Sequence, residues 1–430
     1  MHIVLIYTKH ITNRLTYIAN VLLPESHFQI KFTTSENEFN TSTGTKINYS
    51  NTQFDNAIQI VPHGLLAQKH IENIAVDVLS KNGLIQLFNN KSELGFDVLA
   101  ASFYLISRYE EYLPYQPDAH GRFTSQQSIA GKHGFLSQAL VNRYMLLLHQ
   151  KLHEICKLPL PPIRYNALIT MDIDSAYAFL GKGYWRTIGA YAKLLLTCNF
   201  AKVAQRTQTL LGKADPFNTY SFFASCLRPY NLKPMFFILM GDYGRYDKNI
   251  SYQGKYMQKL IAQLKTYGTI GLHPSYYAVA KNKIGTECKR IQKITHEDVQ
   301  HSRFHFLRLK LPQAYRQLLD AGITNDYSMG YADCAGFRAS TSLTHYFFDI
   351  ENDVTTPLQI HPLTVMDASL HSYMKMQPDE ACDEISKLIN EVKKYGGTFN
   401  SLWHNDTISN LGIWQNWQAV FMHTLKQAAN

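Results

Sequence analysis

The sequence lacks the features that mark several common classes of protein. Its six cysteines are far apart and form no CxxC pair, which argues against a zinc ribbon or a disulfide framework. No apolar run reaches the roughly 18 residues that a membrane-spanning helix needs. The first residues have neither the basic lead nor the small-residue cleavage site of a secretion signal. We therefore expect a soluble, cytoplasmic protein without stable membrane insertion.

Positive charge is present but is not concentrated. The formal net charge is +9, yet the Lys and Arg residues are dispersed and form no compact basic stripe of the kind that nucleic-acid binders carry. These observations argue against nucleic acid as a partner. Aromatic residues are abundant. The 27 Tyr and 23 Phe residues suit a large core and also surfaces that stack on sugars.

The length of 430 residues favours two domains. Consecutive prolines in Leu158–Ile163 prevent a helix and indicate a linker. We therefore predict an N-terminal α/β domain at residues 1–160, without an assigned role, and a second domain at 161–430.

Strands and helices alternate along the chain. The expected strands are His2–Tyr7, Ile58–Val61, Ala167–Asp172, Lys233–Met240, Thr269–Leu272, Arg303–Leu307, Leu358–Met366 and Gly397–His404. The expected helices are Phe96–Ile106, Ser137–Ile155, Lys289–Val299, Leu311–Asp320 and Asp379–Lys394. Such alternation implies a parallel sheet or a barrel, so we expect an α/β protein whose second half is a (β/α) barrel.

A long basic segment, from Tyr177 to about Leu211, is also predicted to be helical. Its Lys and Arg residues alternate with apolar ones. This pattern suits a helix on a membrane surface as well as an ordinary amphipathic helix packed on a core. We favour packing.

The chemistry of the second half begins at Ala167–Tyr177, where an apolar run leads directly into Asp172 and Asp174. A short apolar run bounded by polar residues predicts a buried strand, and α/β proteins place their chemistry at the carboxyl ends of strands. Because the chain turns there, both carboxylates can reach one site. The alternative is a plain strand-to-helix turn in which Asp174 or Ser175 caps the helix.

Further polar residues follow later strands and complete a set of groups with a shared chemistry. They are His273, Arg303, His305, Asp333, Arg338, Asp367 and His404. Two histidines and one carboxylate bind a divalent metal and leave a position open for water. A second carboxylate can take the proton of that water, and another histidine can protonate the leaving group. Together these groups predict metal-assisted hydrolysis of an amide or an ester.

The order of these groups resembles the polysaccharide deacetylase superfamily of metal-dependent carbohydrate esterases. The shared motifs are Thr170–Asp174, His273-x-Ser275, an arginine strand and Leu402–His404. Longer phrases make nearly the whole chain similar to a bacterial subgroup that carries an extra N-terminal domain. These phrases are Phe103–Tyr112, His120–Phe123, Gly271–Tyr276, Tyr327–Asp333, Gly336–Ala339 and Leu402–Asn405.

The resemblance implies a distorted (β/α) barrel, a divalent ion such as Zn²⁺, and hydrolysis of the C–N bond of an N-acetylated saccharide or polysaccharide, or of an ester bond. The implied catalytic residues are Asp172 as base, His404 as general acid, and Arg303 or Arg338 as the arginine that steadies the base. The implied metal ligands are Asp174, His273 and His305. The candidates for contact with the substrate are Tyr277, Asp333, Asp367 and Trp403.

One position departs from the family pattern. The second metal histidine would fall at position 277, one helical turn past His273, and the residue there is Tyr277. The third ligand then comes from elsewhere, with His305 as first choice, or the metal is held weakly or not at all. Two alternatives therefore stay open: a catalytically degenerate carbohydrate-binding protein, and a metal-dependent amidohydrolase whose substrate is not a sugar.

Overall fold

A computed structural model of the chain describes residues 2–429. These residues form two compact units. Unit 1 contains the residues up to Asn166 together with Gly336–Pro362 and Asn390–Thr398. Unit 2 contains Ala167–Ala335, Leu363–Ile389 and the residues from Phe399 on. The boundary predicted at residue 160 lies close to the first division, but it does not account for the two later segments that belong to unit 1.

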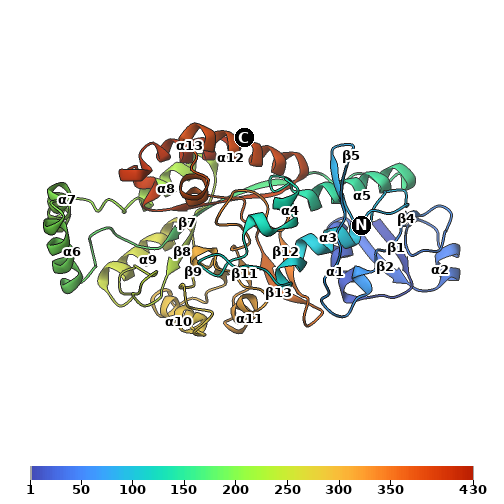
Figure 1. Cartoon of the computed structure of the whole chain (residues 1–430), viewed down its shortest axis with the longest axis horizontal. Helices are drawn as coiled ribbons and strands as arrows, with labels where there is room; N and C mark the ends of the chain where they lie inside the picture. Colours follow the sequence, from blue (N-terminus) through green and yellow to red (C-terminus); the bar gives the residue numbers. More distant parts are fainter. Residues whose placement is uncertain (1, 430) are drawn as a thin grey trace. The chain divides into compact units, whose positions relative to one another are not determined.

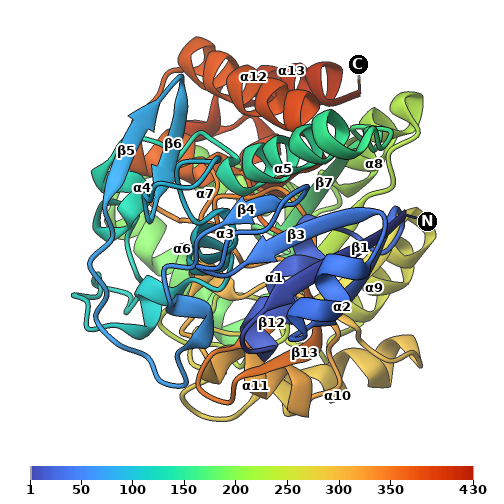
Figure 2. The same cartoon turned by 90° about the vertical axis from the view of Figure 1, so that its right-hand side faces the viewer.

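Unit 1 is built on a parallel sheet with the strand order β2-β1-β3-β4. Its strands are β1 (His2–Thr8), β2 (Phe28–Thr33), β3 (Thr45–Tyr49) and β4 (Ile58–Ile60). Its main helices are α1 (Asn13–Leu22), α3 (Val98–Ile106) and α5 (Leu140–Cys156). These helices pack on one another beside the sheet (Figure 2). The two strands and two helices predicted in this region are therefore confirmed, with small shifts of their ends.

The later segment of unit 1 contributes an antiparallel hairpin of β12 (His345–Asp349) and β13 (Val354–Ile360). Phe348 packs against the rings of Tyr17 and Phe103, with centroid distances of 5.0 and 5.3 Å. The Tyr17 hydroxyl also donates a hydrogen bond of 2.8 Å to the carbonyl of Tyr346. The hairpin is thus part of the unit 1 core, which no local sequence pattern predicted.

His345, the first residue of this hairpin, makes the stability of the fold sensitive to acid. Burial lowers its pKa from 6.5 to about 4, although a hydrogen bond with the Leu343 carbonyl opposes the shift. The unfolded chain therefore binds a proton that the folded chain excludes between these pH values. The stabilisation is present above pH 6.5, is lost as the pH falls toward 4, and amounts to about 3 kcal/mol.

The unfolding free energy of the wild type should decrease from pH 7 to pH 4. In His345→Gln we expect this decrease to be about 3 kcal/mol smaller. Urea unfolding at both pH values measures this difference. The exposed histidine variant His10→Gln is the matched control and should keep the wild-type decrease. An unchanged decrease in His345→Gln would contradict the assignment.

Unit 2 is built on a sheet with the strand order β11-β10-β9-β8-β7-β15-β14, in which every pairing with a known register is parallel. The strands are β7 (Tyr165–Ile173), β8 (Met235–Leu239), β9 (Thr269–His273), β10 (His301–Ser302), β11 (Asn325–Asp326), β14 (Val365–Met366) and β15 (Gly397–His404). This order is linear, and no pairing joins β11 to β14 within residues 2–429. The α/β class with a parallel sheet is confirmed, whereas the predicted barrel is not.

Helices cover the sheet of unit 2. They are α8 (Tyr220–Leu227), α9 (Lys255–Tyr267), α10 (Ile284–Thr295), α11 (Gln313–Asp320), α12 (Pro378–Tyr395) and α13 (Trp417–Ala429). Figure 1 shows α9 and α10 on one side of the strands and α8 and α13 on the other. None of the helices in residues 2–429 is both long and apolar enough to cross a membrane.

Three predicted elements differ from the structure. The strand expected at Arg303–Leu307 is wrong, because β10 ends at Ser302 and the backbone of Phe306 turns with a φ of 62°. The strand expected at Leu358–Met366 is split into the end of β13 and β14, with Pro362 between them, where a proline cannot donate to a sheet ladder. The helix expected at Tyr177–Leu211 is two helices, described below.

Candidate metal centre and active site

Strand β7 carries Asp172 into the interior of unit 2. Ile169, Met171 and Ile173 are buried on one face of the strand, and Thr170 and Asp172 are buried on the other. A strand in the middle of a parallel sheet is covered on both faces. The Asp172 carboxylate is therefore removed from water and needs a charged partner.

Arg303 is that partner. Its Nη1 donates to Asp172 Oδ1 at 2.9 Å and to Thr170 Oγ1 at 2.6 Å, and its Nε donates to the Tyr327 carbonyl at 3.0 Å. The guanidinium also lies over the ring of Phe237, 4.5 Å from its centroid. Because Arg303 is completely buried and held at several points, it fixes the orientation of the Asp172 carboxylate.

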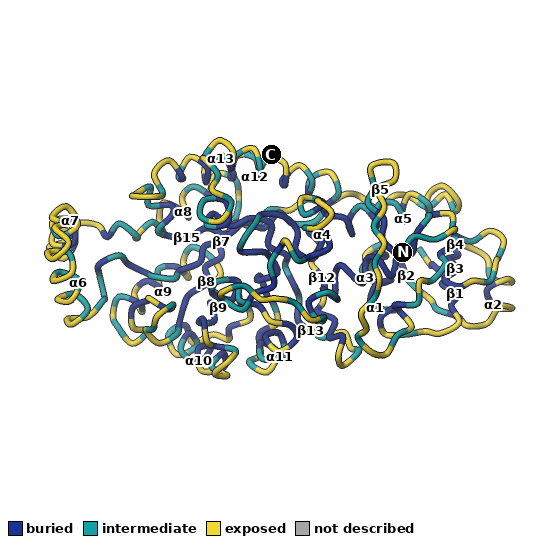
Figure 3. Tube along the Cα trace, in the orientation of Figure 1, coloured by how far each residue is buried: buried dark blue, intermediate teal, exposed yellow. Residues whose placement is uncertain are grey.

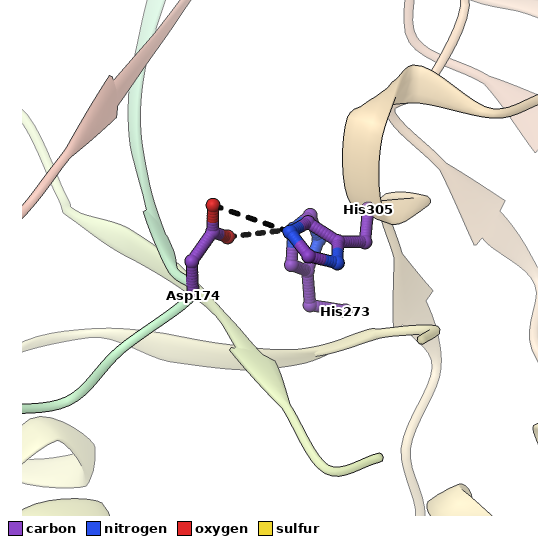
Figure 4. Close-up of side chains that lie close together, drawn as sticks. All are labelled: Asp174, His273 and His305. Atoms are coloured by element: carbon purple, nitrogen blue, oxygen red, sulfur yellow. Dashed lines mark ion pairs between the residues drawn. The ribbon is translucent and has the colours of Figure 1, made fainter. Parts of the chain in front are cut away.

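Asp174, His273 and His305 come together at the carboxyl ends of β7, β9 and β10 (Figure 4). His273 Nε2 lies 3.1 Å from Asp174 Oδ1, and His305 Nε2 lies 3.3 Å from Asp174 Oδ2. One ligand atom from each residue lies within 4.8 Å of the other two. These are the three residues that the sequence predicted as metal ligands, and the structure brings them together.

The donor set fits a small divalent ion. His273 Nδ1 is engaged with the Arg303 carbonyl at 2.5 Å, and His305 Nδ1 donates to Asp247 Oδ1 at 2.9 Å, so both Nε2 atoms face Asp174. Such outer partners are how proteins orient metal-binding histidines. Asp174 Oδ1 is a buried oxygen that lies beside His273 Nε2, 3.1 Å away. The two imidazole nitrogens lie 3.1 and 3.3 Å from different oxygens of the Asp174 carboxylate, and imidazole with carboxylate is a donor set that zinc accepts.

The electrostatics of this group favour a cation. Burial lowers the pKa of His305, but the carboxylates of Asp174 and Asp247 overcome that effect and raise it to about 9. Burial raises the pKa of Asp174, whereas His305, His273 and His404 bring it well below its usual range. The carboxylates therefore hold a positive charge at this position, and a metal ion that binds there displaces a proton.

His404 forms a dyad with Asp367 at the end of β15. His404 Nδ1 donates to Asp367 Oδ1 at 2.7 Å, while the His404 backbone N–H and the Thr407 hydroxyl donate to Oδ2 at 2.7 and 2.6 Å. His404 Nε2 lies 3.8 Å from Asp174 Oδ2. Burial lowers the pKa of His404, but Asp367, Asp174 and Asp172 raise it well above 6.5. These carboxylates therefore favour the protonated form of His404.

The structure corrects three of the roles predicted for other residues. Arg338 belongs to unit 1, where its guanidinium binds Glu111 at 2.6 Å, so the arginine that contacts Asp172 is Arg303. Trp403 is 1% exposed and packs against Phe421, which leaves no face for a sugar. Asp367 is also buried, and its oxygens orient His404 instead of binding substrate.

Two residues of the site were missed by the sequence analysis. Asp247 orients His305 and also accepts the Tyr276 N–H at 3.0 Å. Asn249 donates to the Leu239 carbonyl at 2.8 Å and accepts the Ala176 N–H at 2.9 Å, which fixes the turn after Asp174. Both lie in the irregular segment after β8, which has no periodicity that would have marked them.

Comparisons with known proteins found partial matches to this chain. Residues 4–157 match the model of a family of unknown function (DUF7033), and no curated protein matches the chain. The structure is similar to a protein assigned as a polysaccharide deacetylase from Mycobacterium smegmatis, with 13% identity, a TM-score of 0.43, and coverage of 63% of this chain and 86% of that one. It is also similar to a CE4 family pseudoenzyme from Bacillus anthracis, with 11% identity, a TM-score of 0.30, and coverage of 64% and 66%. Similarity at these levels carries no activity over to this chain.

Proposed function

We propose that this chain is a metal-dependent hydrolase that removes acetyl groups, in the first place N-acetyl groups, from a saccharide or polysaccharide precursor. The observation that supports the proposal is the convergence of two acids and three histidines. His273 Nε2 lies 3.1 Å from Asp174 Oδ1 and 3.8 Å from Asp172 Oδ2. His404 Nε2 and His305 Nε2 lie 3.8 and 3.3 Å from Asp174 Oδ2.

Asp174, His273 and His305 would hold the ion, and imidazole with carboxylate suits Zn²⁺. When bound, the ion supplies Lewis-acid chemistry that polarises an acyl carbonyl and acidifies water. The chain's own base is Asp172, and its own acid is His404. Asp172, oriented by Arg303, accepts the proton of the attacking water.

His404 supplies the opposite proton transfer. Because Asp367 occupies the Nδ1–H, the proton that can move is the one on Nε2, and it goes to the nitrogen or oxygen of the leaving sugar. Tyr277, 40% exposed and four residues beyond His273, and Asp333 are proposed to contact the saccharide. The reaction yields acetate and a free amine or hydroxyl on the sugar.

Acetate release from an N-acetylated chito-oligosaccharide, measured with zinc-loaded protein, tests this function. We expect a chelator to abolish release and added Zn²⁺ to restore it. We expect Asp172→Asn to lower kcat/KM by about 10²- to 10⁴-fold, the usual effect of removing a general base, while zinc binding is retained. The exposed carboxylate variant Asp298→Asn is the control and should release acetate normally. Normal release by Asp172→Asn or Asp174→Ala would sink the proposal.

A catalytically degenerate carbohydrate-binding protein is the second candidate. Tyr277 favours it, because this side chain stands where the resemblance places a metal histidine. That candidate predicts oligosaccharide binding with no measurable zinc binding. Stoichiometric zinc in calorimetry, together with acetate release, would exclude it.

A further inference from the structure

Helices α6 (Tyr184–Leu196) and α7 (Phe200–Leu210) form a hairpin that stands apart from the rest of unit 2 (Figure 1). The first helix ends at Leu196, and Asn199 caps the second, because its side chain accepts the Lys202 N–H at 3.1 Å. No residue of α6 is buried, and most of the hairpin is exposed in Figure 3. An amphipathic helix of a globular protein normally packs its apolar face on a core. α6 contacts α7, where the hydroxyls of Tyr191 and Thr207 lie 2.9 Å apart, but its apolar face has no such cover.

The exposed face of α6 is apolar. Tyr184, Trp185, Ile188, Leu195 and Leu196 recur at spacings that place them along one side of a helix with 3.6 residues per turn. Trp185 is 81% exposed and Leu196 is 85% exposed. A contiguous patch of this kind on a soluble unit marks an interaction site.

The charge around this patch has one sign. Between Ser175 and Ala214 the chain contains six Lys and Arg residues and no Asp or Glu. Lys193, Lys202 and Lys213 are exposed on the hairpin. Two copies of such a hairpin would repel each other, whereas an anionic surface would attract it.

Arg186 and Asp215 hold the base of the hairpin in place. Arg186 donates to the carbonyls of Asn249 and Lys248, each at 3.1 Å, and its guanidinium lies over Tyr243. Where the chain returns from α7, Asp215 accepts the N–H groups of residues 178–180 at 2.8, 2.8 and 3.0 Å. These contacts fix the base of the hairpin, and the apolar face of α6 stays uncovered by the rest of unit 2.

We propose that the α6–α7 hairpin docks this protein on an anionic membrane surface. The apolar face of α6 enters the boundary between headgroups and acyl chains, and the exposed lysines contact acidic headgroups. A helix with Trp and Leu on its apolar face and with Lys residues nearby is typical of membrane interfaces. The proposal concerns attachment to one leaflet and is independent of the hydrolytic activity.

Flotation with vesicles tests the docking. We expect the protein to float with vesicles of phosphatidylcholine containing one third phosphatidylserine, and binding to pure phosphatidylcholine to be at least tenfold weaker. Binding should fall as salt is raised. Trp185→Ser/Leu196→Ser and Lys193→Gln/Lys202→Gln/Lys213→Gln should each lower the affinity for anionic vesicles at least tenfold while keeping the wild-type thermal midpoint.

Two matched controls distinguish the effect of the hairpin from the effects of exposed apolar side chains and of net charge in general. Leu79→Ser/Ile413→Ser removes exposed apolar side chains elsewhere, and Lys31→Gln/Lys259→Gln/Lys289→Gln removes the same net charge. Both should float like the wild type. Lipids brominated on the acyl chain should quench part of the tryptophan fluorescence of the intact protein. This quenched part should be absent in Trp185→Phe.

Three outcomes would overturn the docking. The first is equal binding to neutral and anionic vesicles, and the second is an equal loss of binding in the hairpin variants and the control variants. The third is that the protein does not float but forms a dimer in sedimentation that depends on the hairpin, which would show that a second copy covers this face.

Discussion

Replacing His305 by alanine is expected to lower zinc affinity by more than about 100-fold and to reduce acetate release to background. We propose that this residue takes the place of the metal histidine that position 277 lacks, and its Nε2 lies 3.3 Å from Asp174 Oδ2. Loss of a partner that merely orients a ligand already costs about 10- to 100-fold in affinity, so loss of the ligand itself should cost more. Titration calorimetry with Zn²⁺ measures the zinc affinity independently of catalysis.

Two further variants make the His305 prediction specific. Asp247→Asn keeps the shape but weakens the acceptor for His305 Nδ1–H, and we expect an affinity loss of about 10- to 100-fold. Tyr277→His should leave affinity unchanged and should not rescue His305→Ala, because the ring of Tyr277 packs toward Tyr246 and Tyr276. Undiminished zinc binding by His305→Ala, or rescue by Tyr277→His, would show that the third ligand is elsewhere.

Replacing Arg303 by methionine is expected to cost about 3–5 kcal/mol of unfolding free energy, the usual penalty for leaving one member of a buried ion pair alone. Arg303 and Asp172 are 0% and 1% exposed in their side chains, with the paired atoms 2.9 Å apart. We also expect kcat/KM to fall by about 10²- to 10⁴-fold, because the base loses its fixed orientation. Urea unfolding and acetate release measure the two effects.

A double variant distinguishes pairing from loss of volume. Arg303→Met/Asp172→Asn removes both charges, so we expect it to recover part of the lost unfolding free energy without recovering activity. Arg303→Lys should stay destabilised, because one ammonium cannot reproduce the separate contacts to Asp172, Thr170 and Tyr327. If the double variant is destabilised by the sum of the single variants, the ion pair is not what holds this region.

Local patterns were enough to find the elements that carry the site. The apolar run before Asp172 predicted β7, and the runs before His273 and His404 predicted β9 and β15. Strand alternation and helix periodicity depend on near neighbours in the chain, so these elements follow from sequence. The convergence of their ends follows as well, because parallel strands deliver their carboxyl ends to one edge of a sheet.

His305 shows where that reasoning stops. It was chosen as the third ligand within a predicted strand, but β10 ends at Ser302 and the left-handed turn at Phe306 sets its direction. The choice of residue therefore stands as a proposal, although the element that carries it was predicted wrongly.

Long-range contacts decided the rest. The sequence by itself determined an alternation of strands and helices with Asp172, Asp174, His273 and His404 at strand ends, although we expected a barrel and the sheet is open. Only the tertiary structure separated Arg303 from Arg338, assigned Asp247 to His305, buried Trp403 and left the apolar face of α6 uncovered. Each of these depends on partners that are distant in the chain or on the absence of a packing partner, and periodicity within a segment does not encode what lies against it.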